Sequence, residues 1–309
     1  MRTITIVSGC YNEENNLEEL TRRVFAVADK HPEYQWEYIL ADNCSRDRTA
    51  EVLRELARRD PRIKVIFNLR NFGYIRSNYH ATMQARGDAV IFLASDLQDP
   101  PELIEQFLPL WEQGRKVVAA VKNQSKENWL VFTGRRIYYH LIDRLADVTL
   151  LKNFTGFGLY DREVIQHLRE MDDPYPYFRG QISELGYPVA TVPFVQPVRK
   201  QGRSHANFYI LYDLAMLGFT SHTKVPLRLA MFTGFALSLL SFLIGMVYLV
   251  TKLVYWQEFS IGMGGLTVGV FFLGAVQLVF IGILGEYIGA IHTKVTKRPL
   301  VVERERLNF

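Results

Sequence analysis

The sequence lacks both of the common glycine-rich motifs that bind phosphate groups. No G-x-G-x-x-G follows the first apolar segment, and no G-x-x-x-x-G-K-[ST] occurs anywhere in the 309 residues. A Rossmann-type dinucleotide site and a P-loop are therefore disfavoured. The N-terminal stretch MRTITIVSGCYNEENN turns polar before an apolar segment of signal length is complete, so we expect no cleaved signal peptide.

Charged residues are missing from two long stretches near the C-terminus. None occurs from Leu229 to Thr251 or from Phe259 to Gly285, although the second stretch contains Gln277 and several glycines. Because about 20 apolar residues are enough for a helix to cross the hydrocarbon core of a bilayer, we expect a membrane hairpin. Its short turn lies around Tyr255–Glu258.

Cations flank these two stretches mainly on the sides that lead to the rest of the chain. They are Lys224, Arg228, Lys294, Lys297, Arg298, Arg304 and Arg306. Cytoplasmic segments carry an excess of Lys and Arg, so we expect a multi-pass protein of the inner membrane with both termini and the N-terminal region in the cytoplasm. The two cysteines, Cys10 and Cys44, are then expected to be reduced thiols that pack as small side chains.

The first 200 residues alternate strand-like and helix-like segments. Short runs rich in Val and Ile predict strands at Thr3–Ser8, Tyr38–Ala41, Ile63–Asn68, Ala89–Ala94 and Lys116–Val121. The intervening patterns predict helices at Leu17–Ala28, Ala50–Arg59, Ile75–Ala85 and Glu102–Trp111. Strands joined in this way imply an α/β fold with a mainly parallel sheet covered on both faces. Ligands bind beyond the carboxyl ends of such strands, so we expect the polar segments after the first four strands to converge there.

The pattern is weaker between residues 123 and 198. We predict helices at Thr133–Ala146 and Glu163–Glu170, extended segments at Phe154–Tyr160 and Val189–Pro193, and a loop at Asp172–Gly180. A basic turn, Arg199–Asn207, then leads into Phe208–His222, which is apolar nearly all round. Because this last stretch precedes the first membrane span, we expect a helix lying in or near the membrane interface.

Polar residues with ligand-binding chemistry follow the first two predicted strands. Tyr11 can stack on a nucleobase, and the carboxylates of Glu13 and Asp42 can accept hydrogen bonds from ring N–H groups and ribose hydroxyls. Taken alone, Glu13 and Glu14 are better explained by a helix N-terminus, where the helix dipole favours acids. Asp47 is the expected cap of the following helix, which leaves Asp42 as a candidate ligand acceptor.

The segment FLASDLQDPPE, Phe92–Glu102, brings acids and an amide to the end of a strand. Asp96 and Gln98 are two residues apart, and residues two apart in a strand point the same way. Mg²⁺ or Mn²⁺ commonly takes one or two oxygen ligands from the protein and the rest from water and substrate phosphates. We therefore predict Asp96 and Gln98 as metal ligands. Asp99, before two prolines, is expected to cap the next helix.

Four of these segments together resemble a known family. YNEE (11–14), DNCSRDRT (42–49), RNFGYIRSNYHA (70–81) and SDLQDPPE (95–102) occur in the order and spacing of family 2 glycosyltransferases with a GT-A fold. The sequence is most similar to the polyprenyl-phosphate branch, which includes dolichyl-phosphate mannose synthase and bacterial GtrB-type enzymes. TGFGLYDREV and GEYIGAIHTKVTKRPLVVE extend the similarity over nearly the whole chain. The resemblance implies transfer of a sugar from a UDP- or GDP-sugar donor to a membrane polyprenyl phosphate, usually with a divalent cation.

The resemblance also implies roles for individual residues. The donor nucleotide sugar is expected to bind Gly9, Tyr11, Glu13, Asp42, Asn71 and Asp96. A lipid phosphate needs cations to approach an anionic donor, and guanidinium groups match phosphate in a bidentate fork. The candidate lipid-phosphate residues are Arg135, Arg136, Arg199, Arg203, Ser204 and His205, with Asp96 and Arg203 as catalytic residues. Attraction to anionic headgroups is an equal alternative for Arg135 and Arg136.

The sequence departs from the family pattern at several places. Ala94 stands where the first acid of D-x-D-L-Q is usual, Asp42–Ser45 replaces D-D-G-S, Gly9 replaces a proline, and Thr155–Leu159 replaces G-D-F-R-L. The Arg-Trp pair of processive synthases is absent. We expect inverting transfer of a single sugar. The alternatives are a non-catalytic scaffold that binds nucleotide sugar or lipid phosphate, motivated by Ala94, and a short processive synthase.

The expected organisation has four parts. Residues 1–200 form a cytoplasmic GT-A catalytic domain, 201–226 a juxtamembrane interfacial helix, 227–291 two transmembrane helices and 292–309 a cytoplasmic C-terminal tail. Five glycines of the second span permit close helix contacts in a homo-oligomer, and the resemblance implies a tetramer. We expect no nucleic-acid partner.

Overall fold

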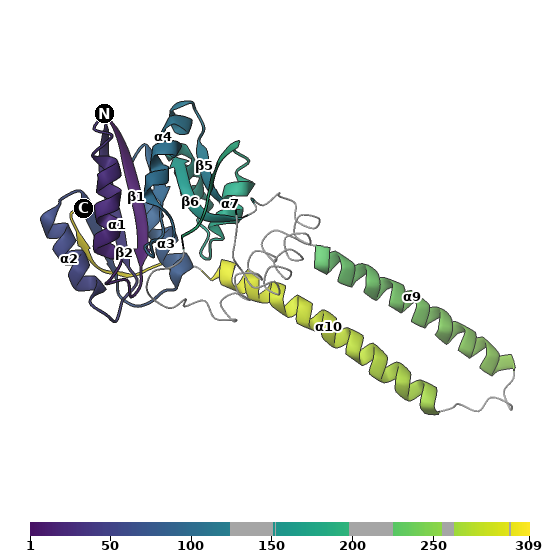
Figure 1. The fold of residues 1–309 in the computed structure, drawn as a ribbon. Helices are drawn as coiled ribbons and strands as arrows, with labels where there is room; N and C mark the ends of the chain where they lie inside the picture. Colours follow the sequence, from purple (N-terminus) through teal and green to yellow (C-terminus); the bar gives the residue numbers. More distant parts are fainter. Residues whose placement is uncertain (124–150, 152, 198–224, 255–262, 297) are drawn as a thin grey trace.

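A computed structural model of the chain describes residues 1–123, 151, 153–197, 225–254, 263–296 and 298–309. Within these residues, a sheet covered by helices forms one body, and two long helices project from it (Figure 1). The predicted helix Thr133–Ala146, the basic turn Arg199–Asn207 and the predicted interfacial helix Phe208–His222 lie outside the described residues.

The sheet contains eight described strands. They are β1 (Arg2–Cys10), β2 (Tyr34–Asp42), β3 (Ile63–Asn68), β4 (Ala89–Phe92), β5 (Val117–Lys122), β6 (Phe154–Asp161), β7 (Val189–Phe194) and β8 (Glu303–Leu307). Their order across the sheet is β7-β5-β6-β4-β1-β2-β3-β8. β1 pairs in parallel with β2 and β4, and β2 with β3, whereas β6 and β8 introduce antiparallel pairs. The predicted α/β fold with a mainly parallel sheet is confirmed.

Helices cover both faces of this sheet. They are α1 (Leu17–Ala28), α2 (Thr49–Arg59), α3 (Tyr74–Gln84), a 3₁₀ turn η1 (Pro101–Leu103) that continues into α4 (Ile104–Glu112), α6 (Arg162–Met171) and α7 (Phe178–Glu184). One apolar core lies under α1, α2 and α4, and the other under α3, α6 and α7. Ile6 of β1 belongs to the first core and Val7 to the second, because successive strand side chains point to opposite faces.

Two local predictions are wrong. The segment Asp172–Gly180 was predicted as a loop, but α7 begins inside it at Phe178. The ring of Phe178 packs edge-on against Tyr160, with 5.1 Å between ring centroids, so tertiary packing holds this short helix. β4 ends at Phe92 and not at Ala94, which changes the local geometry of the predicted metal ligands.

The C-terminal strand β8 was not predicted from the sequence. It pairs antiparallel with β3 at the edge of the sheet, and the Arg54–Glu305 ion pair, at 2.6 Å, ties it to α2. Asn308 Nδ2 donates to the carbonyl oxygens of Ala57 and Ile63, each at 2.8 Å. The chain therefore returns from the second long helix to the sheet, and both termini lie in the same body (Figure 1).

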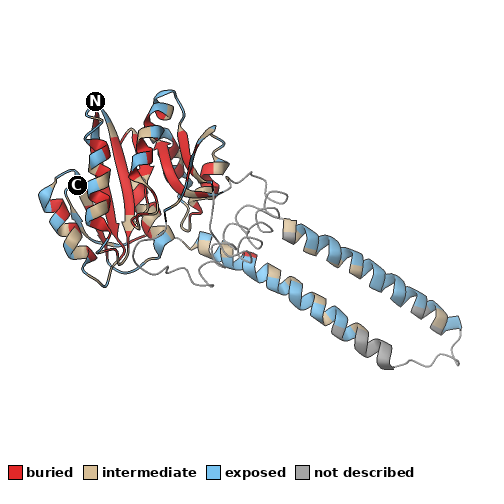
Figure 2. Cartoon of the chain, in the orientation of Figure 1, coloured by how far each residue is buried: buried red, intermediate tan, exposed pale blue. Residues whose placement is uncertain are grey.

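The two projecting helices are α9 (Val225–Val254) and α10 (Met263–Val295). Each contains a segment that is long and apolar enough to cross a membrane, Leu227–Val247 and Phe272–Val295. Almost none of either segment is buried against protein, and exposed residues run along both segments (Figure 2). Apolar helices with this exposure are expected where lipid, and not protein, surrounds them. The two predicted charge-free stretches thus correspond to two candidate membrane helices.

Candidate active site

The polar segments that follow β1, β2, β3 and β4 meet at the edge of the sheet formed by the carboxyl ends of these strands, as predicted. The backbone N–H of Asn12, after β1, donates to Ser45 Oγ, after β2, at 2.9 Å. Ser95 Oγ, after β4, donates to the carbonyl oxygen of Gly9 in β1 at 2.8 Å. These loops are therefore fastened to one another by hydrogen bonds, which makes the edge a preorganised surface for a ligand.

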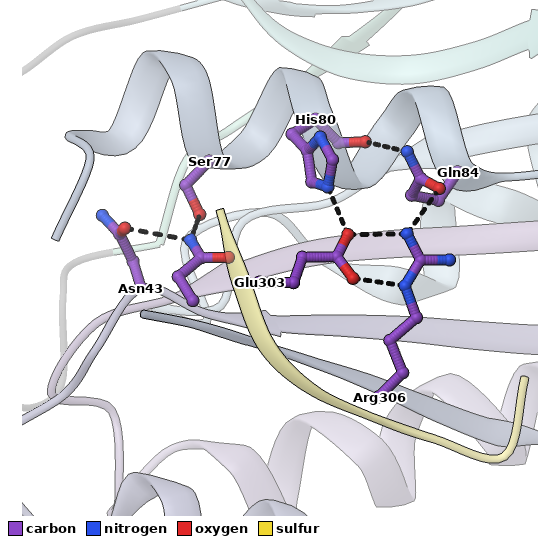
Figure 3. A network of polar contacts seen from close by, with 7 residues as sticks. Asn43, Ser77, His80, Gln84, Glu303 and Arg306 are labelled. Carbon is purple, nitrogen blue, oxygen red and sulfur yellow. Dashed lines mark hydrogen bonds and ion pairs between the residues drawn. The ribbon is translucent and has the colours of Figure 1, made fainter. Parts of the chain in front are cut away.

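Asn43 joins the second and third of these segments. Its Oδ1 accepts from Asn68 Nδ2 at 3.1 Å and from the backbone N–H of Phe72 at 3.0 Å. Its Nδ2 donates to Oδ1 of Asn71 at 3.0 Å. Asn68 also donates to Ser77 Oγ on α3 at 2.9 Å (Figure 3). The predicted donor-binding residue Asn71 is thus held at this edge by Asn43, which is itself buried, with 4% of its surface exposed.

Glu13 is more buried than an acid at an exposed helix end would be. The residue is 8% exposed, and its carboxylate accepts from Asn16 Nδ2 at 2.6 Å. Its backbone N–H donates to Thr49 Oγ1 at 2.8 Å, which ties the loop after β1 to the start of α2. Tyr11, two residues earlier, is partly exposed at the same edge. The structure thus places both predicted donor-binding residues beside the end of β2.

Asp42 ends β2 as a buried carboxylate. It is 1% exposed, and the backbone N–H of Ser45 donates to its Oδ1 at 3.1 Å. Burial raises the pKa of Asp42, while the charge of Arg304 on β8 acts in the opposite direction. Asp47 Oδ1 accepts from the first N–H of α2, that of Thr49, at 3.0 Å, although Arg48, and not Asp47, occupies the N-cap position.

Asp96 and Gln98 do not lie on a strand, contrary to the sequence interpretation. β4 ends at Phe92, and both residues lie in the turn that follows. Leu97 between them has a φ of 60°, and the backbone N–H of Gln98 donates to Asp96 Oδ1 at 3.2 Å. The argument from strand alternation therefore fails, and an aspartate-closed turn places the two side chains instead. Both remain partly exposed at the edge.

Asp99 is not a helix cap, and that prediction is wrong. The residue before η1 is Pro100, and no side chain caps this turn. Asp99 Oδ2 instead accepts from the backbone N–H of Ala94 at 3.1 Å and closes the loop that carries Asp96. The residue is 3% exposed. Burial, together with repulsion from Asp96, raises the pKa of Asp99 to about 6.

The residues at this edge fit a divalent cation that binds together with the donor. Among the described residues, no group of three or more His, Cys, Asp or Glu side chains is arranged to hold a metal. Mg²⁺ does not require such a cage, because it commonly takes one or two protein oxygens and completes its shell with water and substrate phosphates. The partly exposed carboxylate of Asp96 and the amide of Gln98 can supply those oxygens.

The predicted lipid-phosphate residues cannot be placed in this geometry. Arg135, Arg136, Arg199, Arg203, Ser204 and His205 all lie outside the described residues. Their roles stay predictions from the sequence.

Comparisons with known proteins give the family. Residues 5–169 match the family described as Glycosyl transferase family 2. The bactoprenol glucosyl transferase of Shigella phage SfV is 30% identical over 305 residues, which cover 98% of this chain and 99% of the relative. That of Shigella phage SfII is 31% identical over 297 residues, 96% of each chain. A glycosyltransferase of Synechocystis, sll0501, is 32% identical over 298 residues, 96% of this chain and 93% of the relative.

A more distant similarity is to a solved structure. Glucosyl-3-phosphoglycerate synthase from Mycobacterium tuberculosis, in complex with Mn²⁺, uridine diphosphate and phosphoglyceric acid, is 18% identical, with a TM-score of 0.49 over 71% of this chain and 76% of that chain. The family match and the full-length relatives give the conclusion: this chain belongs to glycosyl transferase family 2 and is a glycosyltransferase.

Proposed function

We propose that this protein transfers one sugar from a nucleotide-sugar donor to a polyprenyl phosphate held in the membrane. The observation that carries the proposal is the extent of the match to the bactoprenol glucosyl transferases, which covers 96–98% of the chain. The match therefore includes the apolar helices α9 and α10 as well as the sheet. A lipid acceptor gives these helices a function, because the lipid must be presented from a bilayer to the site of transfer. That site is the edge where β1 to β4 end, here called the catalytic edge.

The donor binds at the carboxyl edge of β1 to β4. The residues proposed to contact it are Gly9, Tyr11, Glu13, Asp42, Asn71 and Asp96. A Cβ atom at Gly9 would lie 1.6 Å from Asn78 Oδ1, so any side chain there would force the side chain of Asn78, on α3, to move. Asp96 and Gln98 would hold Mg²⁺ or Mn²⁺, which when bound supplies positive charge that stabilises a departing diphosphate.

The acceptor chemistry requires alignment and charge control more than proton transfer. A phosphate monoester is already anionic near pH 7, so its oxygen needs no strong general base, and the protein must hold two anions in line. Attack on the anomeric carbon from the side opposite the diphosphate inverts the configuration. The proposed lipid-phosphate contacts are Arg135, Arg136, Arg199, Arg203, Ser204 and His205, with Arg203 acting beside Asp96 in catalysis.

The proposed arrangement is an inner-membrane homo-oligomer, a tetramer, with residues 1–200 in the cytoplasm and residues 227–291 in the bilayer. Residues 201–226 lie at the interface, and 292–309 return as the C-terminal tail. Pairing of β8 with β3 supports the placement of the C-terminal tail on the same side of the membrane as the sheet, since the chain that follows α10 rejoins that sheet. The cations that precede the first span and follow the second favour a cytoplasmic position for these two ends.

Transfer can be tested with full-length protein in lipid nanodiscs. Labelled UDP- and GDP-sugars are supplied one at a time, with and without undecaprenyl phosphate and with and without Mg²⁺ or Mn²⁺. We expect at least one donor to yield label that extracts into organic solvent, and only when lipid phosphate and cation are both present. Donor binding without extractable label from any nucleotide sugar would contradict transfer and favour a scaffold.

A further inference from the structure

A cavity of about 100 Å³ lies against the catalytic edge, between α3, β6 and α7. Its wall includes Tyr74, Asn78, Phe92, Thr155, Tyr177 and Arg179. Phe92 is the last residue of β4, and Asn78 is the residue that a Cβ at Gly9 would strike. The cavity is therefore beside the ends of β1 and β4, where the proposed donor site begins.

The wall of this cavity is built from packed residues. Gly156 has a φ of 102°, and a Cβ there would lie 3.7 Å from the rings of both Phe92 and Phe178. Phe178 is held in turn by Tyr160, whose hydroxyl donates to the carbonyl oxygen of Gly156 at 2.6 Å. The positive φ is what favours glycine here, since a Cβ would be only in ordinary van der Waals contact with the two rings. The cavity is therefore preformed by packed strands and helices.

The polar groups of the cavity indicate what it binds. Thr155 Oγ1 is buried and has no hydrogen-bond partner among the described residues. A buried hydroxyl without a partner costs free energy that a ligand hydroxyl can recover. Arg179 donates from Nη1 to the carbonyl oxygen of Phe154 at 3.2 Å, and a guanidinium carries five N–H groups. Rings and polar donors together suit a pyranose, which has an apolar C–H face and hydroxyls at its rim, whereas an isoprenoid chain would leave Thr155 unsatisfied.

We propose that this cavity receives the sugar ring of the donor. Thr155 and Arg179 hydrogen-bond its hydroxyls, and the tyrosine rings of Tyr74 and Tyr177 lie against its C–H face. The inference rests on the proposed function and deepens it, because it names the residues that distinguish one sugar from another. The diphosphate stays at the edge near Asp96, and the sugar lies toward α7.

The test separates sugar binding from nucleotide binding. Thr155→Val removes the hydroxyl with little change of shape, and Arg179→Ala removes the cation. Calorimetry on the full-length protein in nanodiscs compares UDP and GDP with their sugar conjugates. We expect the nucleoside diphosphate that binds the wild type to bind both variants within about twofold. We expect the nucleotide sugar to bind about tenfold more weakly to Thr155→Val and about 10- to 100-fold more weakly to Arg179→Ala.

Two matched variants serve as controls. Thr191→Val makes the same substitution on an exposed position of β7, and Arg162→Ala removes an exposed arginine at the start of α6. Both should bind nucleotide sugar like the wild type. Steady-state kinetics add a second measurement: the KM for donor should rise in the Thr155 and Arg179 variants, and the KM for polyprenyl phosphate should stay constant.

Several outcomes would overturn the inference. Unchanged nucleotide-sugar affinity in both variants would remove the cavity from donor binding. A raised KM for polyprenyl phosphate with unchanged donor affinity would assign it to the lipid. Equal losses for nucleoside diphosphate and nucleotide sugar would show a role in the fold and none in sugar recognition. A wild-type protein that binds nucleoside diphosphates and no nucleotide sugar would overturn the inference and the proposed function together.

Discussion

Three aspartates at the catalytic edge differ in how far they reach solvent. Asp42 and Asp99 are 1% and 3% exposed, and burial raises the pKa of each. Each is held by a backbone N–H, from Ser45 and from Ala94. Asp96 is partly exposed in the turn after β4 that Asp99 closes. Since a metal must reach its ligand together with the donor phosphates, Asp96 is the carboxylate suited to that contact.

Replacing Asp96 tests this assignment. We expect Asp96→Ala to lower turnover by about 100-fold or more, because the cation that neutralises the diphosphate loses its charged protein ligand. The measurement is initial rate at saturating donor over a titration of Mn²⁺. Asp88→Asn is the matched control: Asp88 precedes β4 at its opposite end and accepts from the backbone N–H of Thr3. Near-normal turnover in Asp96→Ala would remove the metal assignment.

The raised pKa of Asp99 predicts a pH-dependent stability. Between the ordinary pKa of an aspartate and about 6, the folded protein keeps a proton that the unfolded chain has lost. Stability therefore falls as pH rises through this window, by on the order of 3 kcal/mol, and levels off above pH 6. Asp99→Asn keeps an oxygen for the N–H of Ala94 and removes this titration.

The measurement is the Tm of both proteins in detergent from pH 4 to pH 7.5. We expect the Asp99→Asn variant to gain on the wild type as the pH rises, with most of the gain reached by pH 6. Two curves that stay parallel over the whole range would contradict the burial account of Asp99.

At the scale of elements, helices whose apolar residues recur at helical spacing could be predicted from the sequence. The bounds of α1 were predicted correctly, because its apolar residues Leu17, Leu20 and Val24 recur at helical spacing and are all buried. The convergence of the four polar segments followed from the predicted parallel arrangement of the strands, whose carboxyl ends lie together. The turn at Asp96 could not be predicted in this way, since its geometry depends on Leu97 at positive φ and on Asp99 reaching back to Ala94.

β8 could not be predicted for a different reason. Its sequence, ERERL, has no alternating apolar face. It is held by edge pairing with β3 and by charged side chains: Glu303 contacts His80 on α3 at 2.5 Å, and Arg306 bridges Glu303 and Gln84 (Figure 3). Burial would raise the pKa of Glu303, but the hydrogen bonds from Arg306 and His80 outweigh it and lower the pKa.

Removing this acid tests whether the C-terminal strand stabilises the sheet. We expect Glu303→Ala to lower the free energy of unfolding by about 2 kcal/mol, because it leaves the partly buried His80 and the exposed Arg306 without their shared partner. Denaturant titration of the detergent-solubilised protein provides the measurement. Glu55→Ala, which breaks an exposed pair with Arg59 on α2, should change it by less than about 0.5 kcal/mol. Equal effects would show that β8 contributes little.

At the scale of the whole molecule, α9 and α10 lie in the sequence between two strands of one sheet, β7 and β8. If α9 and α10 cross the membrane, residues on the sheet and residues between the two helices, such as Glu258, must lie on opposite sides. Single cysteines at Arg115, an exposed position after α4, and at Glu258 can be labelled with an impermeant maleimide. In intact cells we expect labelling at Glu258 and none at Arg115, with the reverse in inverted vesicles. Labelling of Arg115 from outside would contradict the proposed orientation.

Mass spectrometry of the lipid product tests the central claim most directly. Wild-type protein in nanodiscs is incubated with its nucleotide sugar, Mn²⁺ and undecaprenyl phosphate. The mass of the intact extracted lipid is then measured. The account predicts a single new species, heavier than the lipid phosphate by one sugar residue, that is missing with the Asp96→Ala variant. A ladder of several sugars, or unmodified lipid while the donor is bound, would contradict it.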